Sequence, residues 1–228
     1  MQSDFNLIIV LLLLLVSCSS RDKDFSILTV GMPSEWGNIN PPIQYSVNAD
    51  VIISNQFESL VRVDNNGMIE PLVASSWATS PTFDELRFKI DTSRRFSNGR
   101  HLTAMDIKRS WEQGLKMTPK KFNSAFEDLL NLVEGYEDFE KKKTLSGLLV
   151  DRDFFIIKFK KPHRAALSYL TNSRMSVFLE DHGRFLGTGK YVVTFNDGKY
   201  LEMKPNKYSS ERARFSKVKM MVIDPQEA

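Results

Sequence analysis

Short runs of strand-forming residues, separated by turn signals and helical repeats, constrain the fold of this chain more than any other feature. Asn65-Asn66-Gly67 follows the run Val61–Asp64. Asn196-Asp197-Gly198 lies between two further runs, Tyr191–Phe195 and Tyr200–Lys204. Asn-Gly and Asp-Gly between apolar runs are strong hairpin signals, because these residues tolerate the positive φ that tight hairpin turns need. Hairpins interspersed with helices predict an α/β fold built on a mixed sheet.

Helical spacing of apolar residues predicts two amphipathic helices in the middle of the chain. Ile107 and Trp111 lie one helical turn apart on the face of the first of them. Thr103 is a suitable N-cap for this helix, and Asp106 places an acid near its positive end. The second amphipathic stretch covers residues 122–133. We further expect helices from Ala49 to about Glu58, at Pro71–Trp77 and at His163–Leu170, and strands at Phe25–Val30, Leu86–Asp91, Leu148–Val150, Phe154–Phe159 and Val218–Ile223.

The composition excludes several classes of protein. The chain has 228 residues, with 31 basic and 28 acidic side chains, so the count of charges gives no sign of a nucleic-acid-binding protein. Its single cysteine excludes an intramolecular disulfide and any Cys-rich zinc site. The three histidines lie far apart in sequence. We therefore expect no metal site, no cofactor and no nucleic-acid partner.

The first apolar run has the length of a signal-peptide core. Leu7–Val16 contains ten consecutive apolar residues. Ten helical residues cover about 15 Å, half of a bilayer core of roughly 30 Å, so this run is too short to span a membrane. No second run of this length follows, and the rest of the chain is expected to be soluble. The run therefore predicts a secretory signal peptide.

The only cysteine ends this run in a pattern that resembles a bacterial lipobox, Leu15-Val16-Ser17-Cys18. The resemblance implies a lipoprotein signal peptide over residues 1–17 and cleavage before Cys18, which then carries a diacylglyceryl thioether and an N-acyl chain. Residues 18–24 would then form the lipidated N-terminus and a polar tether. The alternative is a free or buried thiol. The pattern departs from the usual one because residues 1–6 contain Asp4 and no Lys or Arg.

Four ordered groups of motifs extend across the rest of the chain. They are Phe57–Val61 with Gly67 and Glu70–Trp77; Phe88–Ile90 with Arg95–Ile107 and Ser110-Trp111; Gly147 with Asp151–Phe159 and Lys161-Pro162; and Gly187–Tyr191 with Pro205–Tyr208. In this order and spacing they resemble the motifs of solute-binding protein family 5, the oligopeptide-, dipeptide- and nickel-binding lipoproteins of bacterial ABC importers. Three residues depart from the family pattern: Ser59 stands for Gly, Asn98 for Asp and Lys190 for Pro.

Most of the motif residues have a structural interpretation. We expect Trp77 and Trp111 to lie in the core, because buried aromatic residues usually do so. The segment Gly187-Thr188-Gly189 is not a phosphate loop, because it lacks the Gly-Lys-Ser/Thr ending. We expect it to impose a constraint on the backbone. These motifs identify the family without marking its ligand site.

The family resemblance implies a fold and a mechanism. Residues 25–228 are expected to form a mixed-sheet, periplasmic-binding-protein-like lobe (type II, family 5), which is the first pass through lobe I. The chain is expected to be truncated before lobe II, because full family members are about twice as long. The resemblance further implies a cell-envelope receptor that faces the periplasm or the outer surface of the cytoplasmic membrane. Such a receptor closes over a peptide or similar small solute and delivers it to an ABC permease, a shift between open and closed populations.

The resemblance also implies the ligand contacts. The family segment aligns without a gap back from Phe57-Glu58, which places its contact positions at Tyr45, Ser46 and Val47. Phe122 is a weaker candidate. Aromatic residues commonly line such clefts.

Two other classes of function remain open at this point. A lobe-only lipoprotein could have a structural or interaction role without transport. An enzyme is not expected, because His101, His163 and His182 lie in different segments and no Gly-x-Ser-x-Gly, His-Glu-x-x-His or phosphate loop occurs. We therefore expect a binding protein with no catalytic residues.

Overall fold

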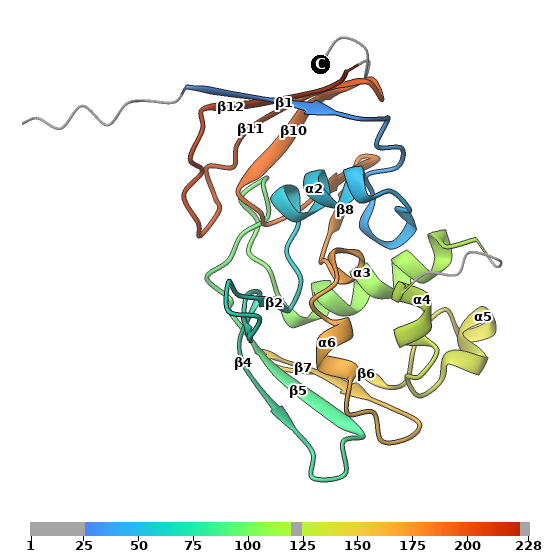
Figure 1. Ribbon diagram of the computed structural model, residues 1–228. Coiled ribbons are helices and arrows are strands. Elements are labelled where there is room, and N and C mark those ends of the chain that lie inside the picture. The colour runs from blue at the N-terminus through green and yellow to red at the C-terminus, as the bar shows by residue number, and fades with distance from the viewer. Residues whose placement is uncertain (1–25, 120–124, 224–228) are drawn as a thin grey trace, which may run out of the picture.

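Two four-stranded sheets, each with its own apolar core, organise the computed structural model, which describes residues 26–119 and 125–223. Figure 1 shows the first sheet at the top, the second at the bottom and the helices α2 (Val47–Gln56) and α3 (Ala104–Met117) between them. The first sheet has the order β1-β12-β11-β10 and the second β4-β5-β7-β6. The predicted α/β fold is therefore confirmed.

The first sheet is the mixed one. Strand β1 (Ile27–Met32) lies parallel to β12 (Lys217–Val222), while β11 (Tyr200–Pro205) lies antiparallel to both β12 and β10 (Tyr191–Asn196). The hairpin between β10 and β11 is the one that its turn signal predicts. Helix α2 packs against this sheet, and their shared core includes Ile52, Ile53, Leu201, Met203, Val218 and Met220.

The second sheet is antiparallel throughout. It consists of β4 (Ala74–Thr79), β5 (Glu85–Ile90), β7 (Phe154–Lys158) and β6 (Leu148–Asp151). Helix α3 lies on this sheet, and the Trp111 ring meets the Phe155 ring edge-on with centroids 5.2 Å apart. Trp111 is fully buried, as predicted.

The beginning of α3 is also as predicted. Both the backbone N–H and the hydroxyl of Thr103 donate to Oδ2 of Asp106, at 2.9 and 2.7 Å. Arg100 donates to the other oxygen of the same carboxylate at 2.8 Å. A local signal thus sets this helix start.

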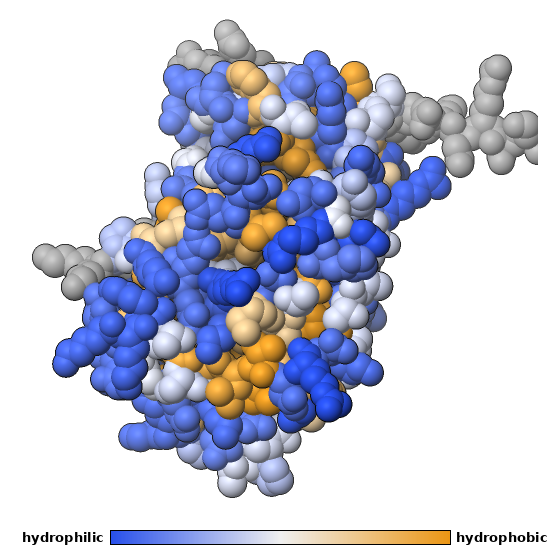
Figure 2. Space-filling view, turned by 180° about the vertical axis from the view of Figure 1, so that it is seen from behind, coloured by the Kyte–Doolittle hydropathy of each residue, from blue (hydrophilic) through white to orange (hydrophobic). Residues whose placement is uncertain are grey.

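Small elements connect the two sheets. They are the hairpins β2 (Val61–Val63) with β3 (Ile69–Pro71) and β8 (Leu179–Asp181) with β9 (Arg184–Leu186), the helices α4 (Ala125–Leu130), α5 (Phe139–Lys142) and α6 (Ala166–Tyr169), and the 3₁₀ turns η1 (Pro41–Ile43), η2 (Tyr136–Asp138) and η3 (Ser173–Met175). Seen from behind, apolar residues reach the surface in several places, with a large group at the level of the second sheet (Figure 2).

Four expected helices differ from the structure. In the stretch 122–133, the helix found among the described residues is Ala125–Leu130, and the chain turns after it. The prediction of a helix at Pro71–Trp77 is wrong. The amides of Leu72 and Val73 donate to the carbonyls of Leu60 and Ser59, and strand β4 follows directly. Pairing with distant backbone outweighs the local preference of a Pro-led segment for helix. Of the helix expected at His163–Leu170, only Ala166–Tyr169 is helical. Helix α2 begins and ends two residues earlier than expected.

Candidate functional site

Two of the predicted ligand residues form an exposed apolar pair where the chain passes from η1 into α2, with Tyr45 before the helix and Val47 at its first position. Tyr45 is 66% exposed and Val47 is 80% exposed. Ser46 lies between them and caps α2, because its Oγ accepts a hydrogen bond of 3.2 Å from the Asn48 amide. Phe122 and Cys18 lie outside the described residues. Tyr45, Ser46 and Val47 therefore lie side by side in one short segment.

A buried polar contact supports this segment from below. Gln44 is 2% exposed, and its Nε2 donates to Oδ1 of Asp50 at 2.5 Å. The hydroxyl of Ser173, in η3, donates to the same oxygen at 2.5 Å. Since both bonds end on a carboxylate, they are charge-assisted and stronger than bonds between neutral groups. The apolar pair thus stands on an anchored base.

One face of α2 continues the exposed surface toward the other end of the helix. Val47, Val51 and Ser54 lie at helical spacing and are all exposed, whereas Ile52 and Ile53 are fully buried. The helix therefore joins the apolar pair at its beginning to a polar pocket at its end.

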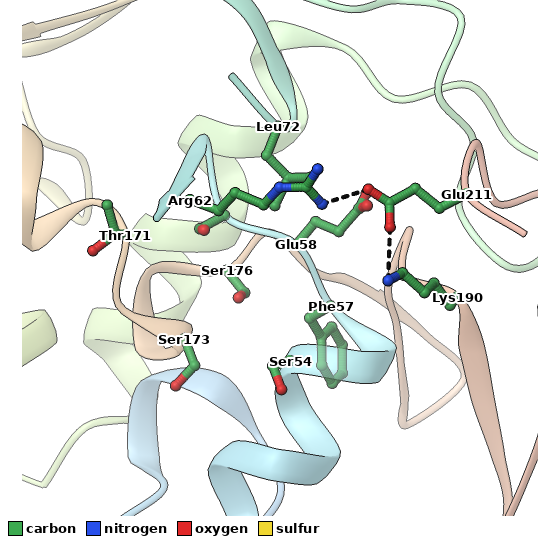
Figure 3. Close-up of a pocket in the computed structure, with 12 residues that line it drawn as sticks. Ser54, Phe57, Glu58, Arg62, Leu72, Thr171, Ser173, Ser176, Lys190 and Glu211 are labelled. Atoms are coloured by element: carbon green, nitrogen blue, oxygen red, sulfur yellow. Dashed lines mark hydrogen bonds and ion pairs between the residues drawn. The ribbon is translucent and has the colours of Figure 1, made fainter. Parts of the chain in front are cut away.

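This pocket is a cavity of about 170 Å³ where α2 runs into β2. Figure 3 shows polar side chains from several segments of the chain around it, among them the hydroxyls of Ser54, Ser173 and Ser176. Its lining comprises Ser54, Phe57, Glu58, Ser59, Arg62, Leu72, Thr171, Ser173, Ser176, Gly189, Lys190 and Glu211. The pocket is therefore polar and carries charges of both signs.

Glu58 is the buried charge of this pocket. It is 5% exposed, and its Oε2 accepts a hydrogen bond of 2.7 Å from Arg94 and one of 2.6 Å from the hydroxyl of Thr188. Arg94 is itself largely buried. The pair neutralises both charges in a place with little access to water.

A chain of alternating charges forms the outer wall of the pocket. The Arg62 guanidinium contacts Glu70 at 2.6 Å. It also contacts Glu211, which in turn pairs with Lys190 at 2.8 Å (Figure 3). Lys190 is one of the residues that depart from the family pattern, and here it adds a charge to the wall. Four separate segments are thereby connected.

The ion pairs of this wall shift the pKa of Glu211. Burial by itself raises the pKa of the Glu211 carboxyl, but the hydrogen bonds from Lys190 and Arg62 outweigh burial and hold the pKa below its ordinary value of 4.5. A carboxyl whose pKa is lowered by folding stabilises the protein above pH 4.5, and this contribution is lost as the pH falls through the folded-state pKa.

We expect Glu211→Gln to lower the free energy of unfolding by roughly 1 kcal/mol at pH 6, because the exchange removes a partly buried charge. Below the folded-state pKa the difference from the unaltered protein should close, since both side chains are then neutral. Urea unfolding at pH 6 and at a series of lower pH values measures how this difference changes. A difference that stays constant with pH would show that the carboxylate charge contributes nothing.

The Gly187-Thr188-Gly189 segment crosses the end of α2 at very close range. A Cβ at Gly187 would lie 2.0 Å from the carbonyl oxygen of Gln56, and one at Gly189 would lie 2.5 Å from that of Asn55. The Gly189 amide donates to the Gln56 carbonyl at 3.0 Å. The prediction that this motif constrains the backbone is therefore confirmed.

Sequence reasoning missed the charged residues of the pocket. Glu58 and Lys190 belong to recognised motifs, but no local signal marked them as a site. Glu211 lies 149 residues from Arg62, and nothing in the sequence relates the two. These charged residues are scattered along the chain, and their spacing does not distinguish them from ordinary surface charges.

Solved structures with the same fold come from solute-binding proteins. The *Haemophilus influenzae* OppA complex with the peptide RPPGFSPFR matches with a TM-score of 0.75 at 18% identity, over 89% of this chain and 43% of that one. The *Escherichia coli* murein tripeptide binding protein MppA matches with a TM-score of 0.74 at 21% identity, over 86% and 42% of the two chains. The two-sheet architecture is thus the fold of these solute-binding protein structures.

The family follows from the sequence match. Residues 68–228 match the bacterial extracellular solute-binding proteins, family 5 (middle region), and the chain belongs to this family. The dipeptide-binding protein DppE of *Bacillus subtilis* is 24% identical over 216 residues, which are 86% of this chain. The family predicted from the four groups of motifs is confirmed.

The chain spans about two fifths of the length of its relatives, 39% of DppE and 42% of MppA. The family is one of extracellular proteins, which indicates export. Among residues 26–119 and 125–223, the helices are all too short or too polar to cross a bilayer.

Proposed function

We propose that this chain is the ligand-facing lobe I of a receptor that captures peptides outside the cytoplasm and delivers them to an ABC permease. The exposed pair Tyr45 and Val47 carries this proposal, because large apolar side chains so fully exposed on an anchored segment are suited to contact a ligand. Binding and release of a ligand neither form nor break a covalent bond, so we assign no catalytic residue and no cofactor.

The backbone around Tyr45 favours an extended peptide as ligand. Gln44 and Ser46 are both extended, with φ/ψ of −71°/150° and −110°/137°. Within the described part of the chain, neither the amide nor the carbonyl of Tyr45 has a hydrogen-bond partner. An extended segment with free backbone groups can pair with the main chain of a peptide, which tolerates many side chains. The dipeptide-binding protein DppE, the murein tripeptide binding protein MppA and the OppA complex with the peptide RPPGFSPFR agree with this class of ligand.

We also propose that the receptor is anchored through a lipid on Cys18 after removal of residues 1–17. The extracellular character of the family supports export, and the apolar run before the cysteine supports a lipoprotein signal. Several acyl chains on one residue hold a protein stably at a membrane. The receptor would then face the periplasm or the outer surface of the cytoplasmic membrane.

Peptide binding tests the ligand site. In the native full-length protein, Tyr45→Ala and Val47→Asp should each weaken the affinity for trialanine and for RPPGFSPFR about tenfold, as expected for central contact residues. Isothermal titration calorimetry measures both affinities. Met68→Asp is the matched control, because Met68 is also 66% exposed but lies on the β2–β3 hairpin.

Unchanged affinities in both variants would place the ligand elsewhere. A native protein that binds neither peptide would contradict the proposal that it is a peptide receptor.

The intact mass of the native protein separates the two-lobe receptor from a lobe-only lipoprotein. A mass near twice that of this chain, plus acyl groups, agrees with the receptor. A mass of about 24 to 25 kDa, close to a processed and acylated chain of this length, would rule out a closing cleft.

A further inference from the structure

Basic residues gather in one stretch near the end of the chain. Between residues 204 and 219 there are six basic residues and one acid, Glu211. Glu211 is already paired with Arg62 and Lys190, so it does not neutralise the stretch. We call these six residues the basic patch: Lys204, Lys207, Arg212, Arg214, Lys217 and Lys219.

Three members of the basic patch have no carboxylate partner. Lys207, Arg212 and Arg214 are exposed, and none forms an ion pair with another described residue. Lys207 lies over the Tyr208 ring at 4.8 Å, and Arg214 lies over the Phe215 ring at 5.6 Å. By contrast, in the run Lys141–Lys143 two lysines pair with Asp138 and Glu140. The basic patch therefore leaves positive charge open to a partner, with aromatic rings beside it.

The basic patch lies beside the point where the described chain begins. The Lys217 amide donates to the Ser26 carbonyl at 3.0 Å, and the Ser216 hydroxyl donates to the same oxygen. Ile27 is paired with Lys217 in the parallel ladder and is 52% exposed. Figure 1 shows the loop before β12 on the same side as the start of β1, with α5 on the opposite side. An acyl group on Cys18, eight residues before Ser26, would hold this side within about 29 Å of the bilayer even with the intervening chain fully extended.

We propose that the basic patch contacts the anionic headgroups of the membrane to which the protein is anchored. The proposal rests on the lipid anchor at Cys18, because the anchor is what keeps the patch near a bilayer. Anionic lipids attract basic residues that are held within a Debye length of the surface. Contact on this side fixes the orientation of the lobe relative to the membrane.

Vesicle binding by the full chain with Cys18→Ser, which cannot be acylated, tests the proposal. We compare vesicles of phosphatidylcholine with vesicles that contain 30% phosphatidylglycerol, at 50 mM salt, by co-sedimentation. The apolar run of residues 7–16 contributes to both compositions, so the ratio of the two partition coefficients isolates the effect of charge. The ratio should be about tenfold or more and should approach one at 0.5 M salt.

Two variants with the same net charge locate the effect. Arg212→Glu with Arg214→Glu should abolish the preference for anionic vesicles, while Lys141→Glu with Lys142→Glu should keep it. Circular dichroism confirms that both variants are folded. No preference in the chain that carries Cys18→Ser alone, or equal losses in both variants, would overturn the proposal. Because the assay involves neither peptide nor acylation, failure here is distinct from failure of peptide binding or of the anchor.

Discussion

Gly187→Ala is expected to lower the free energy of unfolding by about 3 kcal/mol or more, at the upper end of what overpacking costs. The added Cβ would lie 2.0 Å from the Gln56 carbonyl oxygen and 2.8 Å from the Gln56 carbonyl carbon. Both are backbone atoms of α2, so neither can move aside by changing a rotamer. The segment would have to leave the helix end and lose the hydrogen bond between Gly189 and Gln56. Urea unfolding followed by tryptophan fluorescence measures the change.

Gly183→Ala is the matched control for this prediction. Gly183 has a φ of +75°, but a Cβ there would meet nothing within 4 Å. Its substitution should therefore cost only the backbone strain of a left-handed residue, about 1 kcal/mol. If the two variants were equally stable, close approach to α2 would not be the reason for glycine at position 187.

Glu58→Ala is expected to lower the free energy of unfolding by about 3 kcal/mol, because it leaves the buried Arg94 guanidinium with only its longer contact, 3.5 Å, to Asp91. The Arg94 side chain is only 11% exposed, so water cannot replace the lost partner well. The variant also leaves the Thr188 hydroxyl without its acceptor. The same urea experiment gives the value.

A paired variant separates the charge from the packing. Glu58→Leu combined with Arg94→Leu should recover most of the lost stability, because replacing both members of a buried ion pair with apolar residues is often close to neutral. Asp138→Ala breaks the exposed pair between Asp138 and Lys142 and should change stability by less than about 0.5 kcal/mol. A double variant no more stable than Glu58→Ala would show that shape, and not charge, decides this site.

These two positions connect the candidate site to the fold. Glu58 follows α2, and Gly187 precedes β10, yet Thr188 brings the two segments into contact through the Glu58 carboxylate. The base of the polar pocket is therefore held by contacts between residues 130 positions apart.

The predictions that succeeded rest on local chemistry. The Asn-Asp-Gly turn predicted the β10–β11 hairpin, and Thr103 with Asp106 predicted the start of α3, because each signal acts within a few residues. The predicted family was confirmed for a similar reason: its motifs are short and their order along the chain is visible. The helix expected at Pro71–Trp77 failed because the carbonyls that pair with this segment belong to residues 59 and 60.

By itself, the sequence determined the α/β class, most hairpins, the start of α3 and the family. Only the tertiary structure decided that β1 lies parallel to β12, that Glu58 is buried against Arg94 and Thr188, and that Glu211 joins Arg62 to Lys190. The physical reason is the range of each interaction. Turns and caps form between neighbours whose spacing the sequence displays, whereas ion pairs and parallel strands join residues that only the folded chain brings within a few ångströms.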